Sequence, residues 1–330
     1  MKTFFIGVDV SKDWLDFAVC ESLTFEILKT FKCNNTLDGI EKAINICQKL
    51  SSNQKLWFCF EHTGHYGLLL AHLLEQNSLI YSAVPALEII KSIGITRGKN
   101  DVIDAIRIAQ YAAVNTYKIK ESKLPGETIL KIKNLLTYRQ QLVKISTQLK
   151  NSLKTFLIAN KSMNLTMIID DLGAKIEVLK NDILKIEKDI ENEINSSNSL
   201  KETYQRIKTV KGVGFMIAVS MIVYTNNFTS FDEARKFNSY AGIAPFSHSS
   251  GSSIRGKTKT STLRNKTMKK LLFNGANSAV MCDFEMRNYF LRKKEEGKHH
   301  LTIINAVACK LVYRIFAVVK RNEPYVNLVR

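Results

Sequence analysis

Residues 4–10 read FFIGVDV, and two further short apolar stretches follow, WLDFAVCES at 14–22 and FEILKTFKC at 25–33. Polar, turn-like residues separate the three stretches, so they predict three consecutive strands of a β-meander. The next segments predict a helix over 36–50, a strand KLWFCFE over 55–61, a helix over 66–75 and a strand over 79–85. The order β-β-β-α-β-α-β-α predicts an α/β domain that ends near residue 115.

The composition is that of a globular and strongly basic chain. Of the 330 residues 45% are hydrophobic, which is too many for an intrinsically disordered protein. Lys and Arg number 48 against 30 acidic residues, and the formal charge of +18 favours a polyanionic partner. We find no uninterrupted apolar run of about 18 residues, and the N-terminus lacks the features of a signal peptide, so we expect no membrane. Six single cysteines without a CxxC pair predict reduced thiols of a cytoplasmic protein, with no disulfide and no zinc site.

Beyond Pro125 the pattern becomes helical. Apolar residues recur at spacings of three and four from Leu135 to Phe156, and again from Ile176 to Ile190 within a segment rich in Lys and Glu. This spacing predicts two long helices with a coiled-coil-like seam, antiparallel to each other or paired with another subunit. A structural spacer is the favoured interpretation of this segment.

Four carboxylates form the main candidate site. Asp9 lies within the first predicted strand, where an inward-facing acid is costly unless it is paired or bound to a metal. Glu61 ends the strand KLWFCFE, and Asp101 and Asp104, three residues apart, project from one face of a helix. If the first and fourth strands are neighbours, the four acids converge on a cleft that suits Mg²⁺ and phosphodiester chemistry. The structural alternative is that Asp9 caps a turn and Asp101 caps the helix that opens after it.

The second half of the chain carries basic residues suited to nucleic acid. The stretch IKTVKGVGFMIAVSMI (207–222) has the shape of a helix-hairpin-helix turn, although a plain turn between packed helices has the same letters. Seven basic residues and no acid lie between residues 246 and 280, whereas a merely solvated face mixes both signs. The predicted nucleic-acid contacts are Lys211, Gly212, Gly214, Arg255, Lys257, Lys259, Arg264, Lys266 and Lys269.

The stretch SSGSSIRGKT (249–258) matches the phosphate-binding P-loop pattern from Gly251 to Thr258. A P-loop needs a buried strand before it and βα units after it. A segment broken by Pro245 precedes this stretch, and a helical pattern follows it. We therefore interpret the match as accidental and expect no nucleotide triphosphate site.

Five blocks, in this order, resemble one family. They are FIGVDVSKDWLDFAV, FEHTGHYG, KNDVIDAIRIAQYA, VKGVGFMIA and the pattern F-x-x-Y-A-G-I-A-P followed by SSGSSIRGKT. Together they resemble the DEDD-type insertion-sequence transposases, the IS-one-ten group, which also includes Piv-like site-specific DNA invertases. The resemblance extends over nearly the whole chain.

The resemblance implies a RuvC-like (RNase H-like) domain over residues 1–118, whose four acids Asp9, Glu61, Asp101 and Asp104 bind Mg²⁺, with Mn²⁺ as an alternative. It implies a long helical, coiled-coil-like segment over 119–200 and a mainly α-helical transposase domain over 201–330 with a nucleophilic serine. The matching serine is Ser250, with Ser249 as the ambiguous neighbour. Members of the group are similar in using a structured RNA of the element as a guide.

The resulting expectation is a bacterial or archaeal, nucleoid-associated DNA transposase or recombinase that forms a phosphoserine intermediate. Its partners would be double-stranded DNA (element ends and target), a guide RNA and further copies of the chain in a dimer or tetramer. Because the acids and the serine lie in different domains, the active site is expected to be composite. Three alternatives stay open: a metal-dependent junction resolvase, a site-specific DNA invertase, and a non-enzymatic nucleic-acid-binding assembly protein.

Overall fold

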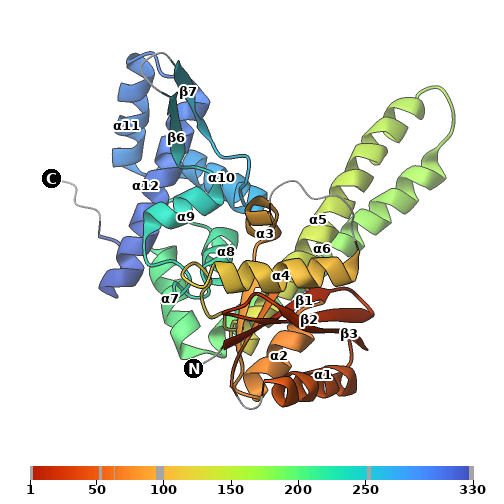
Figure 1. The fold of residues 1–330 in the computed structure, drawn as a ribbon. Coiled ribbons are helices and arrows are strands. Elements are labelled where there is room, and N and C mark those ends of the chain that lie inside the picture. Colours follow the sequence, from red (N-terminus) through yellow and green to blue (C-terminus); the bar gives the residue numbers. More distant parts are fainter. Residues whose placement is uncertain (1–2, 52–53, 63, 94–99, 251–253, 327–330) are drawn as a thin grey trace. The chain divides into compact units, whose positions relative to one another are not determined.

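The computed structural model describes residues 3–51, 54–62, 64–93, 100–250 and 254–326 (Figure 1). The chain divides into two compact units, residues 1–124 and 125–330. The long helices belong to the second unit, and the predicted boundaries at residues 118 and 200 stay predictions.

The first unit is built on a five-stranded sheet in the order β3-β2-β1-β4-β5. The strands are Thr3–Val10 (β1), Trp14–Glu21 (β2), Ile27–Asn34 (β3), Lys55–Glu61 (β4) and Ile80–Val84 (β5). The first three strands form an antiparallel meander, whereas β4 runs parallel to β1 and β5 parallel to β4. The predicted meander and the predicted α/β fold are therefore confirmed.

Helices cover both faces of this sheet (Figure 1). α1 (Leu37–Leu50) and α2 (Leu68–Gln76) lie on one face, α4 (Asp101–Val114) lies on the other, and α3 (Ala86–Ile93) precedes α4 in the chain. Successive side chains of a strand point to opposite faces, so β1 contributes Phe4 and Ile6 to the side of α1 and α2, and Phe5 to the side of α4. Burial on both faces explains why β1 is an almost continuous apolar run.

Gly7 is the point of closest approach between β1 and α4. A Cβ atom added at Gly7 would lie 2.1 Å from the carbonyl oxygen of Ala105 and 2.3 Å from the amide nitrogen of Ala109. Both are backbone atoms of α4, so a side-chain rotation cannot relieve the overlap. Gly7 therefore sets the distance between the strand that carries Asp9 and the helix that carries Asp104.

We expect Gly7→Ala to push α4 away from β1, to lower the free energy of unfolding by about 1–3 kcal/mol and to reduce DNA cleavage. Denaturant unfolding and a cleavage assay measure the two effects. The matched control is Gly173→Ala, since a Cβ atom at Gly173 meets no atom within 4 Å and alanine is the better helix former. Equal unfolding free energies for Gly7→Ala and the wild type would contradict the close approach.

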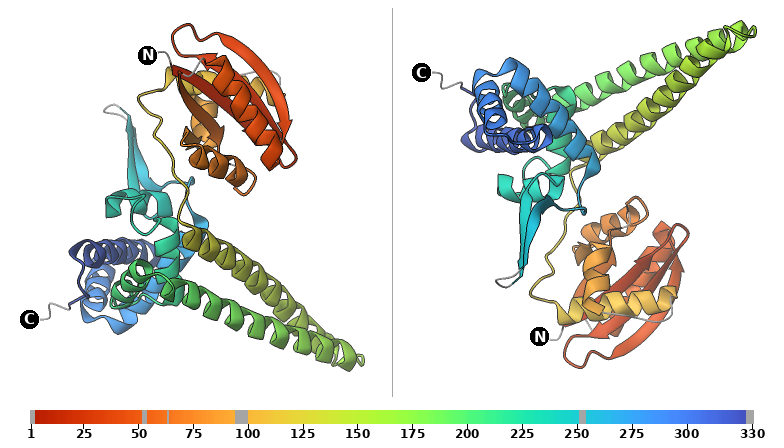
Figure 2. Two further views of the ribbon diagram at one scale, coloured as in Figure 1. Left: turned by 90° about the horizontal axis from the view of Figure 1, so that it is seen from below. Right: turned by 90° about the horizontal axis from the view of Figure 1, so that it is seen from above.

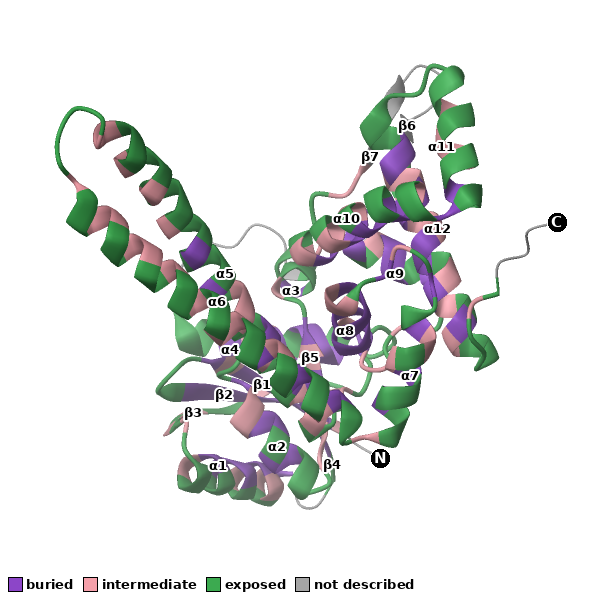
Figure 3. Cartoon of the chain, turned by 180° about the vertical axis from the view of Figure 1, so that it is seen from behind, coloured by how far each residue is buried: buried purple, intermediate pink, exposed green. Residues whose placement is uncertain are grey.

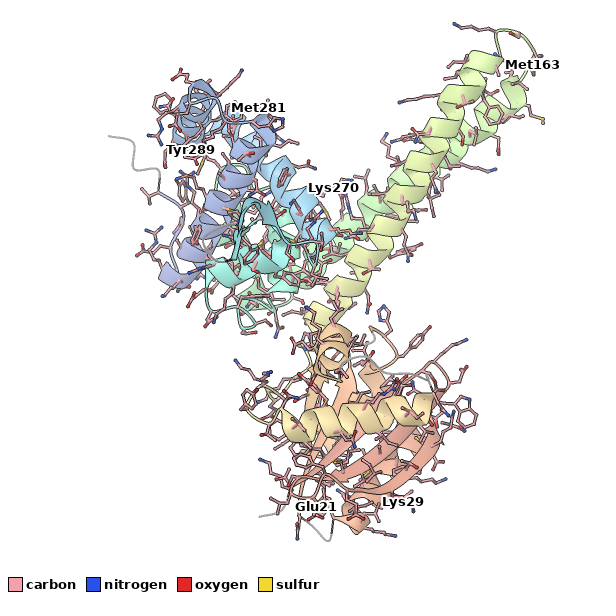
Figure 4. All side chains as sticks on the ribbon, turned by 45° about the horizontal axis from the view of Figure 1, so that its top comes forward. Glu21, Lys29, Met163, Lys270, Met281 and Tyr289 are labelled. Carbon is pink, nitrogen blue, oxygen red and sulfur yellow. The ribbon has the colours of Figure 1, made fainter. Side chains whose placement is uncertain are left out.

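The second unit begins with a long antiparallel helical hairpin, α5 (Glu127–Ala159) and α6 (Thr166–Asn195) (Figure 2). The two predicted long helices are confirmed. Leu136 of α5 and Ile190 of α6 join the hydrophobic core, whereas the loop between the helices carries the exposed Met163 (Figure 4). Tyr138 and Ile145, which the spacing placed in the seam, are 52% and 43% exposed. Coiled-coil packing therefore stays a prediction.

Six helices and a β-hairpin complete the described part of the second unit. They are α7 (Asn198–Lys208), α8 (Phe215–Tyr224), α9 (Ala234–Ala241), β6 (Pro245–Ser250), β7 (Ile254–Thr260), α10 (Lys266–Cys282), α11 (Phe284–Glu295) and α12 (His300–Arg321). By length and composition α12 could cross a membrane. Its residues Val307, Leu311 and Ile315 are fully buried in the core of this unit, as expected of a core helix (Figure 3).

The β6–β7 hairpin contains the Ser- and Gly-rich stretch 249–258. Residues 251–253 at its turn, including Gly251, lie outside the described residues. Lys257 and Thr258 lie in β7, an antiparallel partner of β6. In a P-loop these two positions would begin a helix. The interpretation of the P-loop match as accidental is therefore confirmed.

Candidate active site

Asp9 and Glu61 meet at one end of the sheet. β1 and β4 pair in parallel up to Val8 and Phe60, so the residues that follow, Asp9 and Glu61, are neighbours at the carboxyl ends of the two strands. Asp9 shares the sheet face of Gly7, which is the face that α4 covers. The first and fourth strands are neighbours, which was the condition for the acids to converge.

α4 supplies the other two predicted acids from its first turn. The helix begins at Asp101, and the side chain of Asn100 caps it by accepting a hydrogen bond from the amide of Val102 at 3.2 Å. The alternative role of Asp101 as the cap is therefore wrong, because Asn100 fills that position. Asp101 is exposed and Asp104 is half-buried. The first turn of a helix favours negative charge, since the helix dipole is positive there.

A fifth carboxylate, Asp16 of β2, belongs to the same cluster. It lies directly opposite Asp9 in the β1–β2 pair and is 4% exposed. The ammonium group of Lys32, on β3, lies 3.4 Å from its carboxylate. Asp16 is not among the residues predicted from the sequence. The signal was present, because an acid inside the apolar strand WLDFAVCE needs a partner for the same reason as Asp9.

The electrostatics of Asp9 show that these acids act on one another. The pKa of Asp9 is raised to about 6, first by burial and then by the negative charges of Asp101, Asp104, Glu61 and Asp16. All three of the other predicted acids, together with Asp16, therefore lie close enough to disfavour the ionised form of Asp9. A bound cation would relieve this repulsion.

The donor set fits a hard divalent cation in its chemistry, since every member offers carboxylate oxygens. Two of the acids are engaged by cationic side chains: Arg107 pairs with Asp104 at 2.9 Å, and Lys32 pairs with Asp16. Within the described ranges, no three acidic, histidine or cysteine side chains are already arranged to hold a metal ion. The cluster therefore has the ligand type for Mg²⁺ or Mn²⁺ without a preformed coordination sphere.

Ser250 is the last residue of β6, and its backbone pairs with Ile254 across the hairpin, while Ser249 pairs with Arg255. The side chains of residues 247–259 lie outside the described part of the chain. The assignment of Ser250, and the contacts predicted for Arg255, Lys257 and Lys259, therefore stay predictions.

Two side chains hold the segment that leads into this hairpin. The ammonium group of Lys269 donates to the carbonyl oxygen of Gly242 at 2.9 Å and to the hydroxyl of Thr260, the last residue of β7, at 3.2 Å. The amide of Asn305 in α12 donates to the carbonyl oxygen of Ile243 at 2.7 Å. Lys269 therefore joins both ends of the hairpin, a positioning role that the sequence did not reveal.

Basic side chains gather at the start of α10. A hollow of about 320 Å³ is lined by Arg264, Lys266, Lys269, Lys270, Phe273 and Asn274, and Figure 4 labels Lys270 on α10. Burial, and then the charge of Arg264, lowers the pKa of Lys269. Lys270 belongs to the basic run but was not among the predicted contacts. The hollow is suited to a phosphate group, because it combines several cationic side chains in one concave surface.

In the turn between α7 and α8, helix packing requires one of the two glycines. Gly212 has φ +88°, and a Cβ atom there would lie 2.7 Å from the carbonyl oxygen of Gly275 in α10. Gly214 precedes α8 as its N-cap, is exposed, and has no neighbour near its Cβ position. Lys211 beside them is exposed. Gly214 and Lys211 thus remain open to a phosphate contact, while Gly212 serves helix packing.

Two family profiles match the chain in succession. Residues 6–159, which carry the acids, match the DEDD profile described as "Transposase", and residues 204–291, which carry the hairpin and the basic hollow, match "Transposase IS116/IS110/IS902 family". The chain belongs to the IS110 family of transposases. A transposase cuts and rejoins DNA, so the predicted family and the predicted enzyme class are both confirmed.

Relatives of this transposase include both inverting and transposing proteins. The "Pilin gene-inverting protein" of Moraxella lacunata is 28% identical over 98% of both chains. The "Transposase for insertion sequence element IS1111A" of Coxiella burnetii is 24% identical over 70% of this chain and 69% of its own. T. thermophilus RuvC in complex with a Holliday junction aligns with 36% of this chain and 99% of its own, at 9% identity and a TM-score of 0.29.

Proposed function

We propose that this transposase cuts and rejoins double-stranded DNA through a covalent phosphoserine intermediate, with Ser250 as the attacking residue. Asp9, Glu61, Asp101 and Asp104 hold the divalent cation, Mg²⁺ or alternatively Mn²⁺. The observation that supports this most is the raised pKa of Asp9, which reflects burial beside the other acids. When bound, the cation would lower the pKa of an attacking hydroxyl and neutralise charge that develops on the phosphate.

The proposed reaction conserves one phosphodiester bond. The Ser250 oxygen bonds to phosphorus, the bond from phosphorus to the leaving nucleotide oxygen breaks, and that oxygen takes a proton. The hydroxyl of another strand then attacks the same phosphorus and releases the serine. No ATP is consumed, in agreement with the absence of a P-loop geometry at Lys257 and Thr258. The reaction requires the acids of the first unit and Ser250 of the second to act on one phosphate, from one copy or from two copies of a dimer or tetramer.

A denaturing gel tests this proposal. The full chain is incubated with end-labelled element-end DNA, with and without Mg²⁺, and the products are resolved under denaturing conditions. We expect a Mg²⁺-dependent labelled band that migrates with the protein. Cleavage without any covalent band would instead favour the junction-resolvase alternative, in which water is the nucleophile.

Guide RNA forms the second part of the proposal. It is supported by the family resemblance and by the formal charge of +18. A charge of this size favours a polyanionic partner such as RNA. Sequencing of nucleic acid that co-purifies with the full chain tests it. One enriched, structured RNA encoded beside the gene is the expected result, and nuclease-treated protein that recombines DNA normally would oppose the idea.

Site-specific inversion is the second candidate function. It is favoured by the match of the pilin gene-inverting protein over 98% of both chains. The same strand exchange inverts a segment between two opposed sites and moves a segment between separate sites. A plasmid with two opposed sites and a plasmid with one site plus a target, assayed in parallel, separate the two outcomes.

The basic hollow predicts a salt-dependent contribution to DNA binding. We expect Lys266→Gln and Lys270→Gln each to weaken binding and to reduce the slope of log K against log salt by about 0.9, as for one lost phosphate contact. Fluorescence anisotropy at several salt concentrations measures both quantities. The control is Lys42→Gln, because Lys42 already pairs with Asp38 at 2.6 Å on α1. Unchanged slopes in both α10 variants would remove the hollow from the DNA interface.

A further inference from the structure

Trp14 presents an exposed aromatic ring beside the acidic cluster. The residue is 47% exposed, which is unusual for so large an apolar side chain. The ammonium group of Lys32 lies 5.3 Å from the centre of the ring, within the range of a cation–π contact. Asp16 holds Lys32 from the other side at 3.4 Å. The three side chains thus form a row on one face of β2 and β3 with Lys32 in the middle. Trp14 and Lys32 are accessible, and Asp16 is buried.

The strand register places this row next to Asp9. Asp16 is directly opposite Asp9, and Trp14 lies two residues before Asp16 on the same face of β2. Trp14 and Asp9 are therefore diagonal neighbours, about 7–8 Å apart and within reach of a large side chain. Lys32 is directly opposite Asp16 on β3. If a DNA strand binds with one of its phosphates at Asp9, the adjoining nucleotide would lie at Trp14 and Lys32.

Hydrogen bonds make this corner of the domain rigid. The hydroxyl of Ser11 donates to the carbonyl oxygen of Trp14 at 2.7 Å and accepts from the amide of Trp14 at 3.2 Å. The side-chain amide of Asn35 donates to the carbonyl oxygens of Ser11 and of Tyr66, each at 3.1 Å. The turn that carries Trp14 is thereby tied to the loop that follows β4. The backbone that carries the Trp14 ring is therefore already ordered, and little backbone entropy is lost when a ligand stacks on the ring.

We propose that Trp14 and Lys32 form a binding site for the DNA strand that is cut, with a base stacked on the Trp14 ring and a backbone phosphate at Lys32. This inference rests on the proposed function, because it assumes that the scissile phosphate lies at Asp9. Aromatic stacking accepts any base, and a lysine neutralises the phosphate that would otherwise approach a cluster of carboxylates. Asp16 acts as a positioning residue, since it holds Lys32 over the ring.

Intrinsic fluorescence tests the site directly, since the chain has two tryptophans. Trp57→Phe leaves Trp14 as the one emitter, and binding is measured in metal-free buffer with short single-stranded DNA and with RNA of the same sequence. We expect DNA to quench Trp14 emission and to saturate at the same concentration as an anisotropy titration. Trp57 donates a hydrogen bond to Ser82 at 2.9 Å, and Trp57→Phe loses this bond. A second variant, Trp14→Phe, therefore keeps Trp57. The fluorescence of Trp14→Phe should not be quenched by DNA.

The affinity of substituted proteins for DNA is the second test of the site. Trp14→Ala should weaken DNA binding about 5- to 100-fold, as expected for one lost base stack, and Trp14→Phe should retain most of the affinity. Lys32→Gln should reduce the salt slope of single-stranded DNA binding by about 0.7, and Lys32→Arg should restore it. Lys29→Gln is the matched control, since Lys29 pairs with Val19 and, three residues from Lys32, belongs to the opposite face of β3.

The outcomes separate this inference from the proposed function. DNA binding and Mg²⁺-dependent cleavage without quenching of Trp14, or quenching by RNA but not by DNA, would overturn the inference and leave the function standing. A full chain that quenches on DNA but neither cleaves nor forms an adduct would support the binding site and overturn the proposed function.

Discussion

Asp9→Asn is expected to abolish DNA cleavage, lowering its rate at least about 10³-fold, which corresponds to about 4 kcal/mol of lost transition-state stabilisation. Asparagine keeps the size of the side chain but removes the charge that a divalent cation needs. Asp9 is the residue on which the other four acids act, so its loss should affect the site more than the loss of any exposed member. Cleavage of labelled DNA at saturating Mg²⁺ measures the effect, and a rate within about tenfold of the wild type would contradict the role of Asp9.

The stability of the same variant shows whether the loss is chemical or structural. In the metal-free protein the folded state has a pKa of about 6 at Asp9, above the ordinary value near 4. The stability contributed by this proton is therefore present at low pH and is lost as the pH rises through about 6. Asp9→Asn escapes that loss, so its melting temperature should exceed that of the wild type by a margin that grows between about pH 4 and pH 6. Excess Mg²⁺ should reduce the margin at pH 7, because a ligand that binds only the folded state stabilises it.

Ser250→Ala is expected to eliminate the covalent protein–DNA adduct while DNA binding stays close to that of the wild type. The hydroxyl supplies the bond to phosphorus and has no substitute in alanine. Adduct formation is scored on a denaturing gel, and binding is scored by anisotropy at one salt concentration. An undiminished adduct in this variant would show that another residue is the nucleophile.

Ser249→Ala is the matched control for that experiment. Ser249 and Ser250 are adjacent positions of β6. One serine oxygen bonds to phosphorus in the proposed step, so one of the two variants should lose the adduct and the other should keep it. Loss in Ser249→Ala alone would move the assignment by one residue and keep the phosphoserine mechanism.

The pattern of apolar residues along the chain was sufficient to predict the secondary structure of the first unit. The stretches FFIGVDV, WLDFAVCES and KLWFCFE became β1, β2 and β4 within two residues of their predicted ends. These signals are local, because a strand buried on both faces must be apolar at nearly every position. The same local reasoning found the acids Asp9 and Glu61, since an acid inside or at the end of such a strand stands out from its neighbours.

Spacing alone was insufficient for the long helices and for the serine segment. Helical periodicity located α5 and α6, but Tyr138 and Ile145 of the apolar stripe are exposed in the single chain, because burial depends on which neighbours cover each turn. No strand was predicted in the Ser- and Gly-rich segment, yet β6 and β7 pair there. Its ends are held by Lys269 and by contacts from α12, which lie far away in the sequence.

By itself the sequence determined the family, the α/β character of the first unit and the four acids of the candidate site. The tertiary structure alone decided that Asp16 and Lys32 belong beside Asp9, that Gly7 sets the distance to α4, and that Lys269 joins the ends of the hairpin. The physical reason is the range of the interactions. Strand and helix preferences act between near neighbours, whereas the register of β1 with β2 and the packing of α4 on the sheet bring together groups that are separated along the chain.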